Sequence, residues 1–486
     1  MHLQQLTRRD VSSSCACEQL ASTYPPNLIL PGSQHYTAQA TDAYWDVRAA
    51  LSPACIFLPA TANEVSTALQ VINACDAHFA VRGGGHQNVP GSNNIDAGVL
   101  IALSNLNELS INNTTNTISV GPGRTWYDIY SALEPTGRIA IGGRLKTIGV
   151  PGLTLIGGFH YFNNKYGYAM DNVLSYDVVL GNGTRVVASR SQHPDLFWAL
   201  KGGGGNNFGI VTKFVLKTHA VPQGKVSGTI QSFNESAVPG FLGAVVEASK
   251  VQDSSVAAGM VATVGFNVTT GVTSATLMGV QEGVTAPGAA PSRFENFTAI
   301  SSFAINSVGT MRAWAESLET PMQQYRIVFA HHTIKADTNA LIAIYNIWKD
   351  AVAQIADVEG LNPTFVPNYV SPGSVHAGKD NGVGNVWGLE EEALIVWQFS
   401  TSWTRASDSL RVEQWSRLLS ERIHRLNKEK GLASEFVYMG DAGDWQDPFA
   451  GFPEGNVRRL KGVQEQYDSG GVFTRLSWGG FKLSVA

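Results

Sequence analysis

Apolar positions in the first part of the chain alternate between strand-like and helix-like runs. A short strand is predicted over Ile56–Leu58, and a helix begins at Thr61 and continues past Ile72. A second strand-like run, His78–Val81, leads directly into three consecutive glycines. The pattern predicts a strand–helix–strand unit that carries a glycine loop at its far end.

The segment up to residue 222 contains further short elements. Strand patterns cover Asn94–Leu103, Thr117–Val120 and Thr212–Leu216, and a helical spacing covers Trp126–Leu133. Trp126 and Tyr130 on that helix are best interpreted as ordinary core residues. Mixed short strands and helices of this kind predict one domain over 50–222, preceded by a tail over 1–49.

Beyond residue 222 the pattern changes to longer alternating strands. These include Val226–Ile230 and Val261–Val268, with helical segments over 340–352 and 407–426. Strands grouped with helices between them predict an antiparallel sheet covered by helices on one face. We therefore expect a second domain over 223–440 and an α+β fold for the whole chain.

Three glycine-rich stretches provide the first chemical signal. They are Gly83–His86, Thr147–Phe159 and Lys201–Val211, each next to a strand-like segment. Consecutive glycines let main-chain N–H groups approach an anion closely, so the three loops together suit a long ligand containing a pyrophosphate. Alone, a short glycine run is more often a turn, and a histidine beside it is more often structural than reactive.

Other motifs accompany these loops. They are Val179–Thr184, His193–Leu200, Tyr467–Asp468, Val472–Phe473 and Gly479–Lys482. Together with the loops, they resemble the PCMH-type FAD-binding domain of the vanillyl-alcohol-oxidase family, and most closely its berberine-bridge-enzyme-like branch in a fungal-looking version. The resemblance covers nearly the whole chain. It implies a two-part FAD-binding domain, a substrate domain, and a C-terminal segment over 441–486 that returns to the FAD domain.

The resemblance also implies residues for the cofactor. FAD would be bonded covalently to His86, and by this one link only, because Leu145 stands where some members have a second, cysteinyl link. Ile148 matches the place where the family controls access of oxygen, and its branched side chain leaves oxidase and dehydrogenase both open. The other residues implied to bind FAD are Arg82, Gly83, Gly84, Gly85, Gln87, Thr147, Ile148, Gly149, Gly152, Gly157, Gly158, Asn207, Gly209, Ile210 and Val211.

Candidates for catalysis are weaker. Phe436–Ala442 matches the family's Tyr-x-Asn-Tyr segment, but Gly440 and Asp441 replace its last two residues, so Tyr438 is the surviving match. His160, in the second loop, has an ordinary pKa near neutrality and is a candidate base or a structural residue. Gln398 alternates with Trp397 and Phe399 on a predicted strand and is a candidate for orienting the substrate.

A second strand residue, Glu392, is a weaker candidate for the same face as Gln398, since the two positions have the same parity along the strand. Polar residues on an exposed sheet face are the alternative interpretation of both.

Composition disfavours several classes of partner. The net charge of −5, with 15% charged residues, disfavours nucleic-acid and acidic-membrane partners. The sequence contains no run of about 20 apolar residues, so it predicts no membrane span. We expect a monomer that acts on a small molecule.

Secretion is favoured by two features, although Met1–Asp10 lacks the apolar region of a signal peptide. The first is a set of six Asn-x-Ser/Thr sites, at Asn112, Asn113, Asn182, Asn234, Asn267 and Asn296. The second is a set of four cysteines, Cys15, Cys17, Cys55 and Cys75, which allow three disulfide pairings. A bond from Cys15 to Cys17 is the least favoured because so short a loop is strained. Four free thiols in a cytosolic protein are the alternative, and the spacing does not suit a metal site.

The predicted function is that of an FAD-dependent oxidoreductase. The donor would be a small organic molecule, preferably a secondary-metabolite intermediate, oxidised at a C–H next to oxygen or nitrogen onto flavin N5, with O2 as the acceptor. A flavin-containing cyclase and a carbohydrate oxidase are the alternatives.

Overall fold

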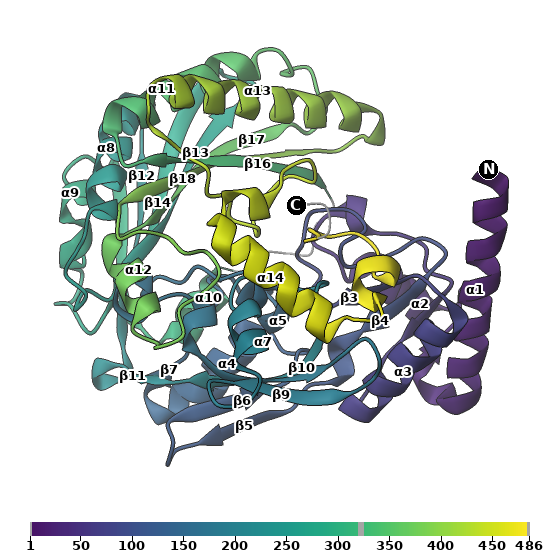
Figure 1. Cartoon of the computed structure of the whole chain (residues 1–486). Coiled ribbons are helices and arrows are strands. Elements are labelled where there is room, and N and C mark those ends of the chain that lie inside the picture. Colours follow the sequence, from purple (N-terminus) through teal and green to yellow (C-terminus); the bar gives the residue numbers. More distant parts are fainter. Residues whose placement is uncertain (1, 319–324, 484–486) are drawn as a thin grey trace.

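The computed structural model describes residues 2–318 and 325–483, with side chains from residue 11 onward. The fold is α+β, as predicted. Besides a short two-stranded sheet, two smaller sheets lie in the lower half of the molecule and one large sheet, roofed by helices, lies in the upper half (Figure 1).

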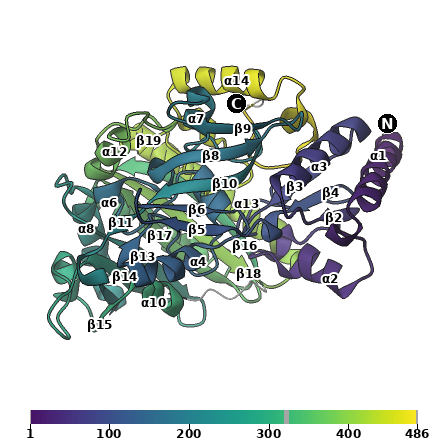
Figure 2. The same cartoon turned by 90° about the horizontal axis from the view of Figure 1, so that it is seen from below.

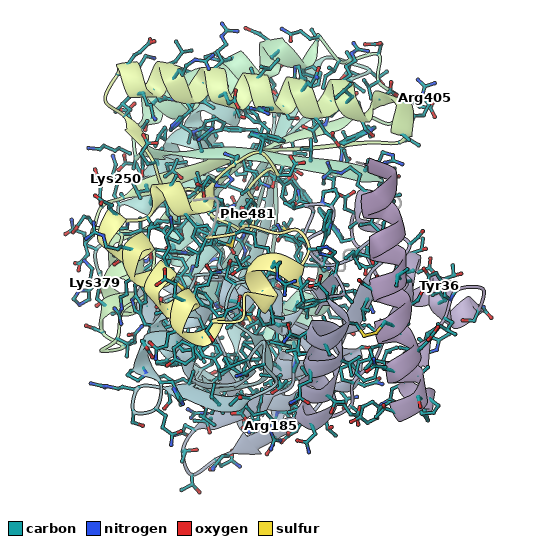
Figure 3. The ribbon with its side chains drawn as sticks, turned by 45° about the vertical axis from the view of Figure 1, so that its right-hand side comes forward. Tyr36, Arg185, Lys250, Lys379, Arg405 and Phe481 are labelled. Carbon is teal, nitrogen blue, oxygen red and sulfur yellow. A yellow bond between two sulfur atoms is a disulfide. The ribbon has the colours of Figure 1, made fainter. Side chains whose placement is uncertain are left out.

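The N-terminal segment is a helix, whereas the sequence predicted only a tail. Helix α1 (His2–Thr23) lies beside α3 (Ala62–Cys75), and the disulfide Cys15–Cys75 joins the two helices. The disulfide Cys17–Cys55 joins α1 to strand β2 (Cys55–Phe57). Figure 3 shows a sulfur–sulfur bond beside α1. The short elements that follow α1 are η1 (Pro25–Asn27), β1 (Leu28–Ile29), α2 (Gln34–Thr37), η2 (Ala38–Asp42) and η3 (Val47–Ala49).

The predicted strand–helix–strand unit is confirmed. Its sheet has the order β1-β2-β4-β3, in which β3 (Phe79–Arg82) and β2 both pair in parallel with β4 (Val99–Ala102). Thr61 caps α3 by accepting a hydrogen bond from the Glu64 N–H. Strand β4 is shorter than predicted because the Asn94 side chain bonds to the carbonyls of Ala40 and Ala49, which holds residues 94–98 in a loop.

The second sheet is antiparallel, with the order β5-β6-β10-β8-β9 (Figure 2). Its strands are β5 (Leu109–Asn112), β6 (Thr117–Val120), β8 (Val173–Val179), β9 (Arg185–Ser189) and β10 (Ile210–Lys217). The elements around it are α4 (Trp126–Leu133), β7 (Arg138–Ile139), α5 (Val150–Leu155), α6 (Asn163–Tyr166), α7 (Pro194–Ala199) and β11 (His219–Ala220). Helix α4 begins as predicted, at a capping box formed by Thr125 and Asp128.

The large sheet is antiparallel throughout, with the order β15-β12-β14-β13-β17-β18-β16-β19. Its strands are β12 (Val226–Phe233), β13 (Ala258–Asn267), β14 (Val272–Glu282), β15 (Phe303–Gly309), β16 (Arg326–Lys335), β17 (Asn362–Val370), β18 (Leu394–Trp403) and β19 (Ala433–Ser434). Helices α8 (Val238–Ser249), α11 (Thr338–Val352) and α13 (Ser409–Glu429) cover its outer face. The smaller helices of this half are α9 (Glu295–Thr298), α10 (Met311–Ser317) and α12 (Pro372–Lys379). The predicted sheet with helices on one face is confirmed.

Strand β18 alternates as the sequence predicted. Trp397 and Phe399 pack against the covering helices, whereas Val396 and Gln398 lie on the opposite, inner face. The prediction that Glu392 shares this face is wrong. Strand β18 begins only at Leu394, and Glu392 is half exposed, with an ion pair to Lys335 at 3.6 Å.

The C-terminal segment crosses from the upper half of the molecule to the lower. After β19 the chain forms η11 (Pro448–Gly451), α14 (Glu454–Tyr467) and η12 (Val472–Leu476), which are yellow in Figure 1. Ser477 forms a bridge to Phe79 of β3, next to the first glycine loop. Among the described residues, no helix combines the length and the apolar composition needed to cross a membrane.

Candidate active site

A large cavity lies where the three sheets and the C-terminal segment meet. It encloses about 1860 Å³, part of it open to solvent. Its wall takes residues from all three glycine loops, from β13 and β16 of the large sheet, and from the segment around Tyr438. The predicted residues that line it are Gly83, Gly84, Gly85, His86, Gln87, Ile148, Gly149, Gly152, Gly209, Ile210, Val211 and Tyr438.

The first and second glycine loops lie directly against each other. A Cβ atom on Gly84 would stand 2.6 Å from the Cα and N atoms of Gly149, and one on Gly83 would stand 2.4 Å from Pro151 Cγ. Two backbones can approach this closely only where side chains are absent. The paired loops therefore present bare main chain to the cavity.

His86 lies at the end of the first loop, where its ring stacks on Trp45 with 5.8 Å between ring centres. Burial lowers the pKa of His86 to about 4, and a hydrogen bond to the Thr147 backbone opposes that shift. Its Nε2 atom is buried without a hydrogen-bond partner in the described part of the chain. A neutral imidazole with a free ring nitrogen is a nucleophile, which suits attachment to a flavin.

Several predicted cofactor residues do not line the cavity. The Arg82 side chain turns away, hydrogen-bonds Gln39 and lies over the Tyr44 ring, so it adds no charge to the cavity wall. The Asn207 side chain instead holds the C-terminal segment, because its Nδ2 donates to Phe481 O at 3.0 Å. The remaining three, Thr147, Gly157 and Gly158, lie behind the wall; a Cβ on Gly157 would meet Trp387 at 2.0 Å.

His160 lies in a separate, smaller cavity of about 330 Å³ that shares Arg144 and Phe159 with the large one. Its Nδ1 accepts a hydrogen bond from the Phe162 N–H at 3.0 Å. Burial, together with the positive charge of Arg144, lowers the pKa of His160 to about 3. The imidazole is therefore neutral and does not face the large cavity.

Gln398 is buried on the inner face of β18, opposite His331 of β16 in the strand register. It is not part of the wall of the large cavity.

Tyr438 packs among aromatic rings at the cavity wall. Its ring meets Phe159 edge to face at 4.8 Å, and Trp387 at 5.8 Å. Burial, with the nearby Asp441 carboxyl adding to it, raises the pKa of the Tyr438 phenol far above its ordinary value, and a hydrogen bond to the Gly158 backbone opposes the shift. A Cβ on Gly440 would stand 2.5 Å from this ring, so the tyrosine ring fills the space that a side chain at position 440 would need.

The sequence missed several residues of the cavity wall. Trp45 and Phe329 extend the aromatic surface beside His86, and Arg144 and Asp441 are its charged members. Asp441 carried a signal, since it replaces a motif tyrosine, whereas Arg144 lies in a segment without a distinctive pattern.

These residues fit FAD. The bare backbone of the paired loops suits a pyrophosphate, and the free nitrogen of His86 lies in the same cavity as the aromatic wall.

Comparison with known proteins gives the same cofactor. Residues 53–189 match the FAD binding domain family. The FAD-dependent monooxygenase prx3 of Penicillium roqueforti is 32% identical over 96% of this chain and 93% of its own length. The bifunctional solanapyrone synthase of Alternaria solani is 29% identical over 98% of this chain and 90% of its own. A solved structure of a berberine bridge enzyme variant, 17% identical, superposes with a TM-score of 0.77 over 96% of this chain and 99% of that one.

The fold, the glycine loops and the fungal relatives agree with the resemblance in the sequence. The chain belongs to the berberine-bridge-enzyme-like flavoproteins of the vanillyl-alcohol-oxidase family, and it is an FAD-dependent oxidoreductase.

Proposed function

We propose that the enzyme oxidises a small organic molecule, preferably a secondary-metabolite intermediate, at a C–H next to oxygen or nitrogen. The observation that carries this proposal is the aromatic wall beside His86, formed by Trp45, Phe159, Phe329 and Tyr438. Such a wall suits a largely apolar molecule better than a sugar, which needs many hydrogen-bonding partners. Carbohydrate oxidation is therefore the less favoured alternative.

The cofactor is proposed to be bonded to His86 by a single link. Bound FAD supplies the chemistry by accepting two electrons and a hydrogen from the donor carbon. The free imidazole nitrogen supports the link, and Leu145, which lines the cavity, offers no thiol for a second one. We propose O2 as the acceptor, with Ile148 in the cavity wall controlling its access.

The sequence suggested Tyr438 and His160 as candidate bases and Gln398 as a residue that orients the substrate, and we propose a changed role for each of them. Tyr438 would shape the substrate site, because it alone of the three lines the large cavity. His160 and Gln398 would act from behind the wall by positioning Arg144 and the inner face of β18.

We also propose that the chain is divided at residues 49, 222 and 440 into a tail, an FAD-binding domain, a substrate domain and a C-terminal segment, and that the protein is a monomer.

We propose that the protein passes through the secretory pathway, and the two disulfides support this.

The first experiment is an anaerobic absorbance spectrum of the purified protein with candidate donors, followed by admission of air. Bleaching of the flavin that recovers in air is expected for an oxidase. Flavin that stays oxidised with every donor would contradict the proposal. Product containing an atom of labelled O2 would instead assign monooxygenation, the activity in the name of the Penicillium relative.

The covalent link has its own measurement. After acid precipitation, the flavin absorbance is expected in the pellet of the wild-type protein and in the supernatant for the His86→Ala variant. Free flavin from the wild-type protein would rule out the link.

A cyclase is the second candidate, favoured by the replacement of the motif Asn-Tyr by Gly440 and Asp441. It would convert its substrate without bleaching the flavin and without an acceptor.

A further inference from the structure

Asp441 lies at a turn whose backbone is fixed from several directions. Its N–H donates to Tyr438 O at 3.1 Å, and its carbonyl lies 2.9 Å from His331 Nδ1. The Tyr438 N–H donates to His331 Nε2 at 2.8 Å, so the neutral ring carries its proton on Nδ1 and donates it to Asp441 O. The ring thus holds both ends of the turn.

His331 is itself locked in place. It is fully buried on β16, and Gln446 Nε2 donates to its carbonyl at 2.6 Å. Burial lowers the pKa of His331 to about 4, so this tautomer persists at neutral pH. The Asp441 carboxyl is therefore presented to the cavity from a rigid support.

The carboxyl of Asp441 has few polar neighbours. Asn368 Nδ2 lies 3.5 Å from its Oδ2, and Asn368 Oδ1 accepts from Arg144 at 3.2 Å. Arg144 also donates to Met260 O at 3.2 Å, which anchors its guanidinium beside the cavity. Burial raises the pKa of Asp441 to about 6, and the positive charge of Arg144 opposes that shift.

The ionisable groups that face Asp441 are Arg144, the neutral His331 ring and the neutral Tyr438 phenol. An acid that ionises just below neutral pH is matched to proton abstraction under ordinary conditions. Tyr438 is a poor base because it ionises only far above neutrality, and His160 lies outside the cavity.

We propose that Asp441 is the catalytic base and that the donor is an alcohol carried on an apolar body. This inference rests on the proposed flavin-dependent oxidation. The Asp441 carboxylate would take the hydroxyl proton, and FAD, when bound, would accept the carbinol hydrogen with its electron pair. The O–H and C–H bonds break, a C=O bond forms, the alcohol is oxidised by two electrons, and Asp441 holds the proton. Arg144 balances the negative charge that develops on oxygen.

The test uses the flavin-loaded protein in anaerobic stopped-flow reduction with aromatic and aliphatic alcohols, the matching amines, and sugars. Alcohols are expected to reduce the wild-type flavin fastest, with a rate that rises as pH passes through about 6. The Asp441→Asn variant should be slower by about 100-fold or more at pH 8 and should lose the pH step.

The control is Asp444→Asn, three residues along the same segment and exposed to solvent, which should behave as the wild type. Reduction of the Asp441→Asn variant at the wild-type rate, or faster reduction by amines than by alcohols, would overturn the inference. If no donor reduces the flavin of the wild-type protein, the proposed oxidation itself is contradicted, and this result is distinguishable from a failure of the Asp441 inference alone.

A binding measurement without turnover gives an independent readout. Benzoate binding, followed by the flavin absorbance, should weaken as pH rises through about 6, since an ionised Asp441 repels the anion. The Asp441→Asn variant should bind benzoate without this dependence. Equal pH dependence in both proteins would exclude an ionising Asp441 at the site, even if the variant were inactive for another reason.

Discussion

At the scale of single residues, Gly84 shows why the glycine loops tolerate so little change. The clash that a side chain would make is with the Gly149 backbone and not with a flexible side chain. The loops are separated by about 60 residues of chain, so local sequence gives no sign that they touch. We therefore expect flavin retention to depend on a contact between glycines of two different loops.

Substitution Gly84→Ala is expected to lower the free energy of unfolding by about 1–3 kcal/mol and to release flavin, because the two backbones must separate. Thermal unfolding and the ratio of flavin to protein absorbance measure both effects. Gly462→Ala is the matched control. Gly462 lies within α14 with open space around its Cα, so alanine there should stabilise the protein by about 0.5–1 kcal/mol. A Gly84→Ala variant that retains its flavin and its stability would contradict the loop contact.

At the scale of elements, the two disulfides decide where α1 lies. Both start from the same turn of α1: Cys15 is bonded to Cys75 of α3, and Cys17 is bonded to Cys55 of β2. Sequence alone left three pairings open, because only the tertiary placement of α1 brings each pair of sulfurs together.

The double substitution Cys17→Ser and Cys55→Ser removes one disulfide and should lower the free energy of unfolding by about 4 kcal/mol or less. The reason is that the unfolded chain regains the entropy of a loop of 38 residues that the disulfide had closed. Hydrogen exchange should rise in α1 before it rises in the large sheet. The pair Cys15→Ser and Cys75→Ser is the comparison and should have a similar effect. Uniform exchange across the whole chain would argue against α1 as a separately tethered element.

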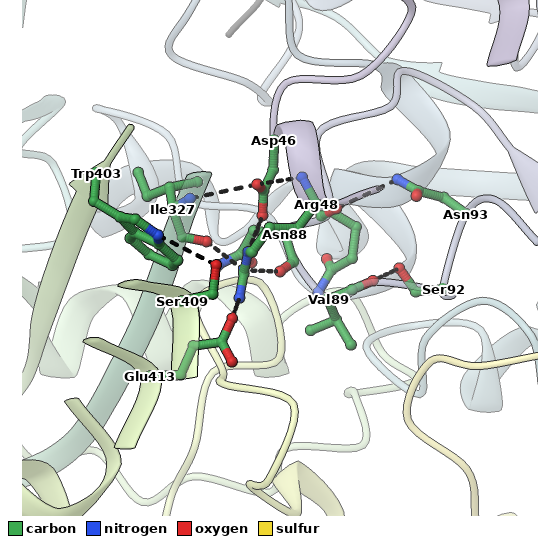
Figure 4. Close-up of polar contacts among 11 residues, drawn as sticks. Asp46, Arg48, Asn88, Val89, Ser92, Asn93, Ile327, Trp403, Ser409 and Glu413 are labelled. Carbon is green, nitrogen blue, oxygen red and sulfur yellow. Dashed lines mark hydrogen bonds and ion pairs between the residues drawn. The ribbon is translucent and has the colours of Figure 1, made fainter. Parts of the chain in front are cut away.

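At the scale of the whole molecule, a buried arginine joins the two halves. Arg48 pairs with Asp46 at 2.8 Å and with Glu413 of α13 at 2.8 Å, and it donates to the carbonyls of Asn88 and Ile327 (Figure 4). Asn88 follows the loop of His86, and Ile327 lies on β16 of the large sheet. Arg48 therefore fixes the first glycine loop relative to the large sheet and its covering helix.

Substitution Arg48→Met should lower the free energy of unfolding by about 3–5 kcal/mol, because the Asp46 carboxyl, which is fully buried, loses its partner. Urea unfolding measures the loss. Arg405→Met is the control; Arg405 is exposed and forms surface ion pairs, so the change should stay within about 0.5 kcal/mol (Figure 3). An equal loss of unfolding free energy in the two variants would show that the buried ion pairs of Arg48 stabilise the protein no more than surface ion pairs do.

The whole molecule should also lose stability as pH falls. Burial holds the pKa values of five histidines at about 4 or lower, below the ordinary 6.5: His86, His160, His219, His331 and His332. Between pH 6.5 and pH 4 these histidines bind protons in the unfolded chain but stay neutral in the folded one. The free energy of unfolding is therefore highest above pH 6.5 and declines from there towards pH 4. Each group contributes at most about 1.4 kcal/mol per pH unit. Buried carboxyls with raised pKa values, such as Asp171 and Asp441, oppose this decline because the folded chain binds their protons more readily than the unfolded one.

The melting temperature of the wild-type protein between pH 8 and pH 5 measures this effect. The His160→Gln variant should show a shallower decline, since it removes one of the five groups. A melting temperature that rises as pH falls from 7 to 6 would contradict the assignment.

Much of the architecture follows from the sequence by itself. Hydrophobic periodicity predicted the strand–helix–strand unit, the alternating faces of β18 and the sheet with helices on one face, because each depends on residues a few positions apart. The glycine-rich stretches likewise marked loops that bring bare backbone to the large cavity, since only glycine removes the side chain.

Tertiary structure alone decided which side chains share the cavity. Arg82 stands beside a glycine loop but turns to Gln39, and His160 belongs to a second, smaller cavity. Asp441 and Arg144 come from distant segments and meet at the cavity only because His331 fixes one turn and Met260 anchors the other side. The orientation and burial of these side chains are set by residues far away in the chain, so no local pattern of residues encodes them.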